Sequence, residues 1–335
     1  MVRRLVRAVW HERKENDMWW LWIIIVLAVL CIAATAGIFV FTFYNPPKLR
    51  KDDYYFPPGH TAEPFKDEIC GLIDKLRERP CEDVYTDSFD GLRLHARYYH
   101  SAEASPLVIC CHGYRSTAFK DFCAGSQYLL EKGFNVLIID ERAHGTSGGN
   151  VISFGINERQ DVLGWANWAV KRFGPVPMYL FGISMGAATV LLASELDFPR
   201  SLRGIIADCP YSSPRKIIVN TAAGMHIPSW TLIFARIGAA LLGGFKLSDI
   251  DASDCVKKSK VPILIIHGEA DSFVPPCMSE GPAEACPDMV KRITVAGADH
   301  ALSFLVDPER YKAAVEEFFR RTMRQQPVSA EQNKA

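Results

Sequence analysis

A serine flanked by glycines is the strongest chemical signal in this sequence. The motif G-I-S-M-G is centred on Ser184; it follows the apolar run at residues 177–183 and precedes the helix-forming run AATVLLASEL. Strand, sharp turn and helix in this order predict a strained elbow that exposes the serine hydroxyl. Gly182 and Gly186 suit such an elbow, because side chains there would collide with the neighbouring strand and helix. We therefore expect Ser184 to be a nucleophile.

A serine hydroxyl is a weak nucleophile and needs a base, which an acid orients. When a serine elbow comes first in the chain, the acid and then the base should follow it. Asp271 and His300 fit these roles, because each comes just after an apolar run and both would reach the sheet edge that carries Ser184. Weaker alternatives stay open. They are Asp208, Glu269 and Asp299 as the acid, His112, His144 and His267 as residues that hold loop geometry, and His226 as a substrate contact.

Attack on an acyl carbonyl also requires two main-chain N–H groups that stabilise the oxyanion. One is expected from Met185, the residue after the nucleophile. The other should come from the loop that follows the run PLVICC, where Tyr114 is the predicted donor through its main chain. The side chain of Tyr114 is also expected to line the substrate pocket.

The elements that position these residues alternate along the chain. Two segments, VYTDSF and LRLHARYY, flank Asp90-Gly91 and predict a hairpin. Apolar runs that indicate buried strands follow, separated by helical segments, which is typical of a mostly parallel sheet covered on both faces. The expected strands are 106–111, 134–140, 177–183, 203–209, 261–267 and 291–297, and the expected helices are 67–78, 120–132, 157–173, 185–197 and 308–323.

One long interval interrupts this alternation. Residues 214–260 contain the apolar run IPSWTLIFARIGAALLGGF and are too long for a single crossover, so we expect a helical cap inserted over the sheet. The predicted organisation has an N-terminal flank (1–18), a transmembrane anchor (19–44), a linker (45–66), a catalytic domain (67–322) that includes the cap, and a polar tail (323–335).

The anchor is predicted from residues 19–44, which contain no charged side chain. A helix of this length spans about 39 Å, enough to cross a hydrocarbon core of about 30 Å with some tilt. A cleaved signal peptide would have a shorter apolar region, whereas here the apolar run continues past its small residues. Five basic residues precede the segment, so the positive-inside rule slightly favours a cytoplasmic N-terminus and an extracytoplasmic catalytic domain.

Composition excludes some other classes. Lys+Arg and Asp+Glu both total 38, so no basic excess points to nucleic acid as a partner. The ten cysteines form no CxxC pair and no Cys/His cluster with zinc spacing, and structural thiols are the favoured interpretation. Disulfides between Cys70 and Cys81, or between Cys277 and Cys286, stay open if the domain faces an oxidising space.

Taken together, the motifs HGY, DERAHGTS, GISMGA, HGEADSFVP and ADH resemble the α/β-hydrolase superfamily. The sequence is most similar to its serine aminopeptidase-like or monoacylglycerol-lipase-like branch, and within it to bacterial membrane-anchored members. The resemblance covers residues 80–322 and implies a Ser–Asp–His triad with neither metal nor cofactor. Relatives often have glycine where Ala143 stands.

The expected activity is hydrolysis of an acyl ester, with an acylglycerol or another lipid-like molecule as substrate. A membrane-tethered peptidase or amidase and an acyl-thioesterase are the alternatives, and a non-catalytic binding protein that keeps the fold is a further one. A peptidase would more plausibly carry acidic residues in the cap to hold a free amine, and residues 214–247 contain none. The partners expected are an acyl substrate and the membrane.

Overall fold

The structure is a computed structural model that describes residues 19–57, 59, 61–247 and 250–324. The predicted N-terminal flank and nearly all of the predicted polar tail lie outside the described residues. Within the described part, one eight-stranded sheet has the order β1-β2-β4-β3-β5-β6-β7-β8. Only β2 runs against the others, because it pairs antiparallel with both β1 and β4 while every other pairing is parallel. The predicted α/β architecture is confirmed.

The strands match the predicted apolar runs closely. The hairpin of β1 and β2 turns at Gly91, where φ is 85° and glycine is favoured. The remaining strands are short and almost entirely buried apart from β8. The bounds are β1 Glu82–Asp87, β2 Arg93–Tyr99, β3 Leu107–Cys111, β4 Asn135–Asp140, β5 Met178–Ile183, β6 Leu202–Asp208, β7 Ile263–Gly268 and β8 Val290–Val295.

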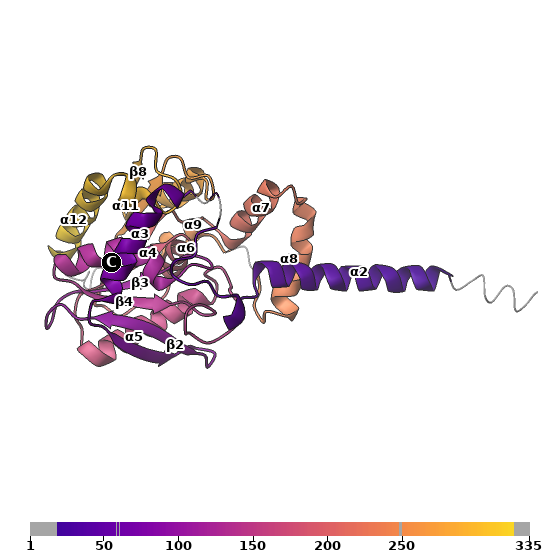
Figure 1. Ribbon diagram of the computed structural model, residues 1–335, viewed down its shortest axis with the longest axis horizontal. Coiled ribbons are helices and arrows are strands. Elements are labelled where there is room, and N and C mark those ends of the chain that lie inside the picture. Colours follow the sequence, from indigo (N-terminus) through magenta and orange to yellow (C-terminus); the bar gives the residue numbers. More distant parts are fainter. Residues whose placement is uncertain (1–18, 58, 60, 248–249, 325–335) are drawn as a thin grey trace, which may run out of the picture.

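Helices cover both faces of the sheet (Figure 1). One layer contains α5 (Glu158–Phe173), α6 (Met185–Ala193), α9 (Ala252–Val256) and α10 (Glu280–Ala285). The other contains α3 (Lys66–Arg77), α4 (Ala118–Glu131), α11 (Ser303–Val306) and α12 (Pro308–Arg324). The 3-10 turns are η1 (Pro47–Leu49), η2 (Glu63–Phe65), η3 (Ser229–Thr231) and η4 (Pro276–Ser279).

The two layers give the protein two cores, one on each side of the sheet. Strand β3 shows how one sequence serves both, because successive side chains of a strand point to opposite faces. Leu107 and Ile109 pack into the core beneath α5 and α6, whereas Val108 and Cys110 pack into the core beneath α4 and α12. This is why the buried strands appear in the sequence as continuous apolar runs.

A long apolar helix, α2 (Trp19–Thr42), projects from the domain as a straight rod (Figure 1). It is long and apolar enough to cross a membrane, a test that a signal sequence near the N-terminus also passes. Its last turn belongs to the domain. Phe43, which follows the helix, is fully buried and makes edge contacts with the rings of Phe154 and Phe245.

The segment predicted as a linker, residues 45–66, lies against the domain. The guanidinium of Arg50 donates to the main-chain carbonyls of Gly145, Ser147 and Gly149 at 2.7–2.9 Å. Further along, Lys120 donates to the carbonyl of Tyr55 at 2.9 Å. These bonds attach the segment to the loop after β4 and to α4.

The segment predicted as a cap, residues 214–260, contains two helices that stand apart from the sheet, α7 (Pro214–Gly224) and α8 (Leu232–Leu241). Helix α8 packs against the domain-proximal part of α2, as Figure 1 shows. The glycine at 238 allows this approach, because a Cβ there would lie 3.0 Å from the Cβ of Phe39. The cap is therefore packed between the loops at the carboxyl edge of the sheet and the apolar helix α2.

Candidate active site

Ser184 occupies a sharp turn between β5 and α6. Its backbone has φ 56° and ψ −113°, a conformation that L-residues rarely adopt. The turn is held by its own main chain, since the N–H of Ser184 donates to the carbonyl of Asp208 and its carbonyl accepts from Ala188. The geometry is that of the predicted elbow.

Both glycines of the motif are sterically required. A Cβ at Gly182 would lie 2.2 Å from the carbonyl oxygen of Gly186, and a Cβ at Gly186 would lie 1.9 Å from the carbonyl oxygen of Cys111. These contacts are with backbone, which cannot move aside as a flexible side chain can. The elbow is thus pressed against the end of β3 from one side and against the first turn of α6 from the other.

The sequence-predicted base and acid lie beside the serine. His300 Nε2 is 2.8 Å from Ser184 Oγ, and His300 Nδ1 is 2.8 Å from Asp271 Oδ2. An ionised carboxylate only accepts, so Nδ1–H is the donor to Asp271 and Nε2 accepts the serine proton. Three residues far apart in the sequence therefore form one continuous hydrogen-bonded chain.

Asp271 is held as a carboxylate. Its burial alone raises its pKa, but hydrogen bonds from His267 and His300 and from the main chain outweigh burial and lower the pKa below its ordinary value. The main-chain donors are the N–H groups of Phe273 and Val274, at 3.0 and 2.7 Å from Oδ1. A negative charge is thus available to orient His300 at neutral pH.

The loops that carry acid and base are tied to each other. Asp299 accepts from the main-chain N–H of His300 at 2.7 Å and from that of Ser272 at 2.8 Å. A carboxylate that neighbours the base therefore fixes the distance between the two loops. Asp299, which the sequence left open as a candidate acid, therefore bonds to the main chain of both loops instead of to the His300 imidazole.

The loop after β3 is fixed on both sides of Tyr114. The N–H of Gly113 donates to Asp121 at 2.6 Å, and the N–H of Arg115 donates to His144 Nε2 at 3.0 Å. Met185 is the first residue of α6, and the first N–H groups of a helix have no partner within it. The N–H groups of Tyr114 and Met185 are thus the candidates for binding an oxyanion.

The alternative acid Asp208 has a different environment. It is fully buried at the end of β6 and accepts from Tyr311 Oη at 2.9 Å. Burial raises its pKa to about 6. Its second oxygen has no partner among the described residues. Asp208 therefore lacks the set of hydrogen bonds that keeps Asp271 ionised.

Three of the four other histidines weighed from the sequence hold loops together. His112 Nδ1 lies 2.9 Å from the carbonyl of Gly113, and its Nε2 accepts from the main-chain N–H of Glu141 at 3.1 Å. His144 likewise bridges two main-chain groups, and burial lowers its pKa well below the ordinary value, so its ring is neutral. His267 Nε2 donates to the carbonyl of Val274 at 3.0 Å. The fourth, His226, is exposed two residues after the end of α7.

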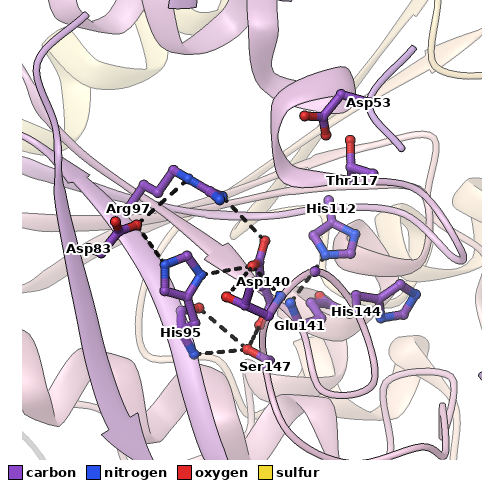
Figure 2. A network of polar contacts seen from close by, with 12 residues as sticks. Asp53, Asp83, His95, Arg97, His112, Thr117, Asp140, Glu141, His144 and Ser147 are labelled. Carbon is purple, nitrogen blue, oxygen red and sulfur yellow. Dashed lines mark hydrogen bonds and ion pairs between the residues drawn. The ribbon is translucent and has the colours of Figure 1, made fainter. Parts of the chain in front are cut away.

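A second Ser–His–Asp grouping lies at β2 and β4 (Figure 2). His95 is 2% exposed, and its two ring nitrogens are each 2.8 Å from a carboxylate, that of Asp140 or that of Asp83. The hydroxyl of Ser147 donates to the carbonyl of Asp140 and accepts from the N–H of His95. Within the described part of the chain no hydroxyl bonds to the His95 imidazole, so this grouping joins two strands and a loop and has no activated nucleophile there.

Among the described residues, one group has the composition of a metal site. Ligand atoms of Cys209, Asp271 and His300 lie within 4.8 Å of one another. Burial raises the pKa of the Cys209 thiol well above its ordinary value, which keeps it protonated, whereas a metal ligand must be a thiolate. Asp271 and His300 are already bonded to each other, so this donor set does not fit a metal.

Ser184 lies where two cavities meet. The larger, of about 640 Å³, has a mixed lining, in which Lys51, Asp52 and Lys120 lie beside apolar side chains such as Phe122 and Leu305. The smaller, of about 240 Å³, is bordered by apolar side chains of α7, α8 and the end of α2. Phe273 lies between the two, with its ring 5.1 Å from that of His300.

Solved structures with the same architecture identify the fold. An esterase from Pyrococcus furiosus superimposes with a TM-score of 0.62 at 23% identity, covering 84% of this chain and 99% of that one. Est1E from Butyrivibrio proteoclasticus does so with a TM-score of 0.56 at 21% identity, covering 72% and 99%. A family model described as serine aminopeptidase, S33, matches residues 102–257.

The chain has the α/β-hydrolase fold. Among curated proteins, the chain is 28% identical over 227 residues to the uncharacterized protein YqkD of Bacillus subtilis, covering 66% of this chain and 73% of YqkD. It is also 28% identical over 187 residues to the lysophosphatidylserine lipase ABHD12 of Danio rerio. That match covers 53% of this chain but only 47% of ABHD12, about half of its length.

The sequence did not identify Asp121 or the histidine partner of the Tyr114 loop. Asp121 lies on α4, eight residues from Gly113, and no motif marks it. His144 was recognised only as a loop residue, and its bond to Arg115 depends on the β3 and β4 ends being adjacent. Ala143, where relatives often have glycine, has φ 61°, a conformation that favours glycine.

Proposed function

We propose that this α/β hydrolase is a serine esterase with Ser184 as nucleophile, His300 as base and Asp271 as the acid that orients the base. The observation that carries the proposal is the hydrogen-bonded chain of two 2.8 Å contacts from Ser184 through His300 to Asp271. Its members follow each other in the chain order expected of an elbow serine, its acid and its base.

In the proposed mechanism, Ser184 Oγ attacks an acyl carbonyl while its proton passes to His300 Nε2. Asp271 stabilises the imidazolium, and the main-chain N–H groups of Tyr114 and Met185 donate to the oxyanion. The proton on Nε2 then goes to the departing alcohol, leaving an acyl-serine ester. Water, deprotonated by the same imidazole, releases the carboxylic acid and restores the serine.

The substrate we propose is an acyl ester with a lipid-like acyl group. The apolar cavity beside Ser184 has room for an acyl chain, and the charged groups in the mixed lining of the larger cavity suit a polar alcohol. The likeness to a lysophosphatidylserine lipase also favours lipids, although only over half of that protein. Peptide or amide hydrolysis is the second candidate, because the matching family model is described as serine aminopeptidase. Thioester hydrolysis is a further candidate.

We further propose that α2 is a retained single-pass anchor with the catalytic domain on the extracytoplasmic side. Helix α8 packs closely on Thr35 and Phe39 of α2, and removal of α2 as a signal sequence would take this packing surface away. Protease added to intact cells should then digest the catalytic domain. Protection of the domain until the cells are opened would reverse the orientation.

The experiment that tests the proposed activity compares p-nitrophenyl esters of increasing acyl length with aminoacyl p-nitroanilides, using the full chain and its Ser184→Ala variant. Ester cleavage that has a chain-length optimum and disappears in the variant is expected. Selective anilide cleavage would make the protein a peptidase. Hydrolysis that persists in Ser184→Ala would contradict the assignment of the nucleophile.

A further inference from the structure

The apolar cavity beside Ser184 has an unusual wall. On one side it is lined by α7 and α8, for example Ile218, Ala222 and Leu232, and on the other by Ile38 and Phe41 near the end of α2. A helix whose length and composition suit a membrane therefore forms part of the pocket that reaches the nucleophile.

The cap meets α2 well before the helix ends. A Cβ at Gly238 of α8 would lie 3.3 Å from the carbonyl oxygen of Thr35, and Ala235 and Ala239 are buried beside it. Thr35 is about 10 Å from the end of α2 at about 1.5 Å per residue. Since α2 is about 36 Å long and a hydrocarbon core is about 30 Å thick, a spanning α2 holds α8 below the membrane surface.

The outer face of the cap has the chemistry that this depth requires. Large apolar side chains on this face are open to solvent, and a contiguous exposed apolar patch marks a protein or membrane contact. Within residues 214–247 the sequence carries no acidic side chain but has Arg236 and Lys246, which suit anionic lipid headgroups. The exposed apolar residues on this face are Trp230, Ile233, Ile237, Leu241 and Leu242.

We propose that this cap face is embedded in the same leaflet as the end of α2, and that the acyl chain of a membrane-resident amphiphile reaches Ser184 through the cavity between cap and anchor. The inference rests on the proposed function and names its substrate class, an ester with one acyl chain and a polar alcohol. The acyl chain enters the apolar cavity, and the alcohol lies in the larger cavity near Lys51 and Lys120.

The test is photo-crosslinking in a bilayer. The full chain with Ser184→Ala, which cannot turn over an ester through Ser184, is reconstituted in phosphatidylcholine vesicles that contain a lysophosphatidylcholine with a diazirine in its acyl chain. Crosslinked peptides are mapped by mass spectrometry. Crosslinks at Ile218, Leu232 and Phe41 are expected in the cavity, together with crosslinks at Trp230 and Leu241 on the outer face.

Two matched pairs of variants separate the cavity from general lipid contact. Ile38→Trp and Ala222→Trp fill the cavity from opposite walls and should lose the cavity crosslinks. Val40→Trp and Ala223→Trp place the same side chain on the same helices outside the cavity and should keep them. If a cavity variant fails to fold, the pair on the other helix provides the comparison.

Crosslinks confined to lipid-facing positions of α2 such as Leu27 and Ile32, or equal crosslinking in both members of each pair, would overturn the inference. Fluorophosphonate labelling of the unmodified chain tests the proposed function separately. If Ser184 is labelled but the cap is not crosslinked, the protein is a serine hydrolase whose substrate arrives from water, and the inference is wrong. If the cap is crosslinked but Ser184 is not labelled, the cavity binds lipid and the proposed esterase function is wrong.

Discussion

The hydroxyl of Tyr114 donates a 2.8 Å hydrogen bond to the main-chain carbonyl of Thr42, in the last turn of the apolar helix α2. The adjacent Arg115 donates to the carbonyls of Phe41 and Tyr44 at 2.9 and 3.0 Å. The last carbonyls of a helix have no partner within it. Tyr114 and Arg115 therefore supply hydrogen-bond donors to the main-chain carbonyls at the end of α2. These bonds connect the loop proposed to bind the oxyanion with the proposed anchor.

Tyr114→Phe should weaken this coupling without emptying the pocket. The ring keeps its stacked position 4.9 Å from that of Phe154, but one hydrogen bond is lost. We expect a loss of about 1 kcal/mol in the free energy of unfolding in detergent, with slower hydrolysis of short esters. Tyr85→Phe, on the exposed edge strand β1, is the control. Equal stability of parent and Tyr114→Phe would show that the bond contributes nothing.

Gly186→Ala should prevent correct formation of the elbow. The added Cβ would meet the carbonyl oxygen of Cys111 at 1.9 Å, and neither backbone can yield without moving β3 or α6. We expect loss of soluble folded protein, measured by circular dichroism and thermal unfolding. Gly164→Ala on α5 is the matched control, because its Cβ would meet no atom within 4 Å and alanine favours a helix by up to about 1 kcal/mol. A folded, active Gly186→Ala protein would contradict this account of the turn.

Asp271→Asn and Asp208→Asn should separate the two candidate acids. An amide at 271 keeps the shape but cannot stabilise an imidazolium at His300, so kcat should fall by roughly 10³ to 10⁴. Asp208 contacts Tyr311 and not the base, so Asp208→Asn should change stability more than kcat. The measurement is kcat on one p-nitrophenyl ester, with thermal unfolding alongside. A larger kcat loss in Asp208→Asn would reassign the acid.

Glu141→Gln should make stability less dependent on pH. Glu141 is 2% exposed, neither carboxyl oxygen has a partner among the described residues, and burial raises its pKa well above the ordinary value. A raised folded-state pKa means that stability is complete below the unfolded value near about 4.3 and falls as pH rises, by up to about 1.4 kcal/mol per pH unit.

The advantage of Glu141→Gln over the parent should therefore grow from pH 4.5 to pH 8, measured as the difference in free energy of unfolding. Glu131→Gln, exposed at the end of α4, serves as the control and should show no such trend. A difference between Glu141→Gln and the parent that is constant with pH would mean that this carboxyl does not titrate on unfolding.

Much of the fold follows from the sequence because its signals are local. The strands around Val108 and Ile265 appear as unbroken apolar runs, since parallel strands covered on both faces bury every side chain. The neighbourhood of Ser184, Asp271 and His300 was predictable for a related reason. Each comes at the end of a strand, and the carboxyl ends of parallel strands share one edge.

Other features depend on contacts between distant segments and leave no such signal. The apolar pattern of α2 predicts a membrane helix, but nothing in it indicates that Ile38 borders a cavity next to Ser184. The prolines and charges of residues 45–66 suggested a linker, whereas Arg50 is bonded to three carbonyls of the β4–α5 connection. A side chain that bonds to backbone far along the chain can be recognised only once both segments are placed.

The measurement that tests the central claim most directly is covalent labelling of the full chain with a fluorophosphonate, followed by mass spectrometry of its peptides. Among the described residues, Ser184 carries the one hydroxyl that is hydrogen-bonded to His300. The account therefore predicts a single adduct on Ser184, lost in Ser184→Ala and strongly reduced in His300→Gln. An adduct on another residue, or labelling that survives in folded Ser184→Ala protein, would contradict it.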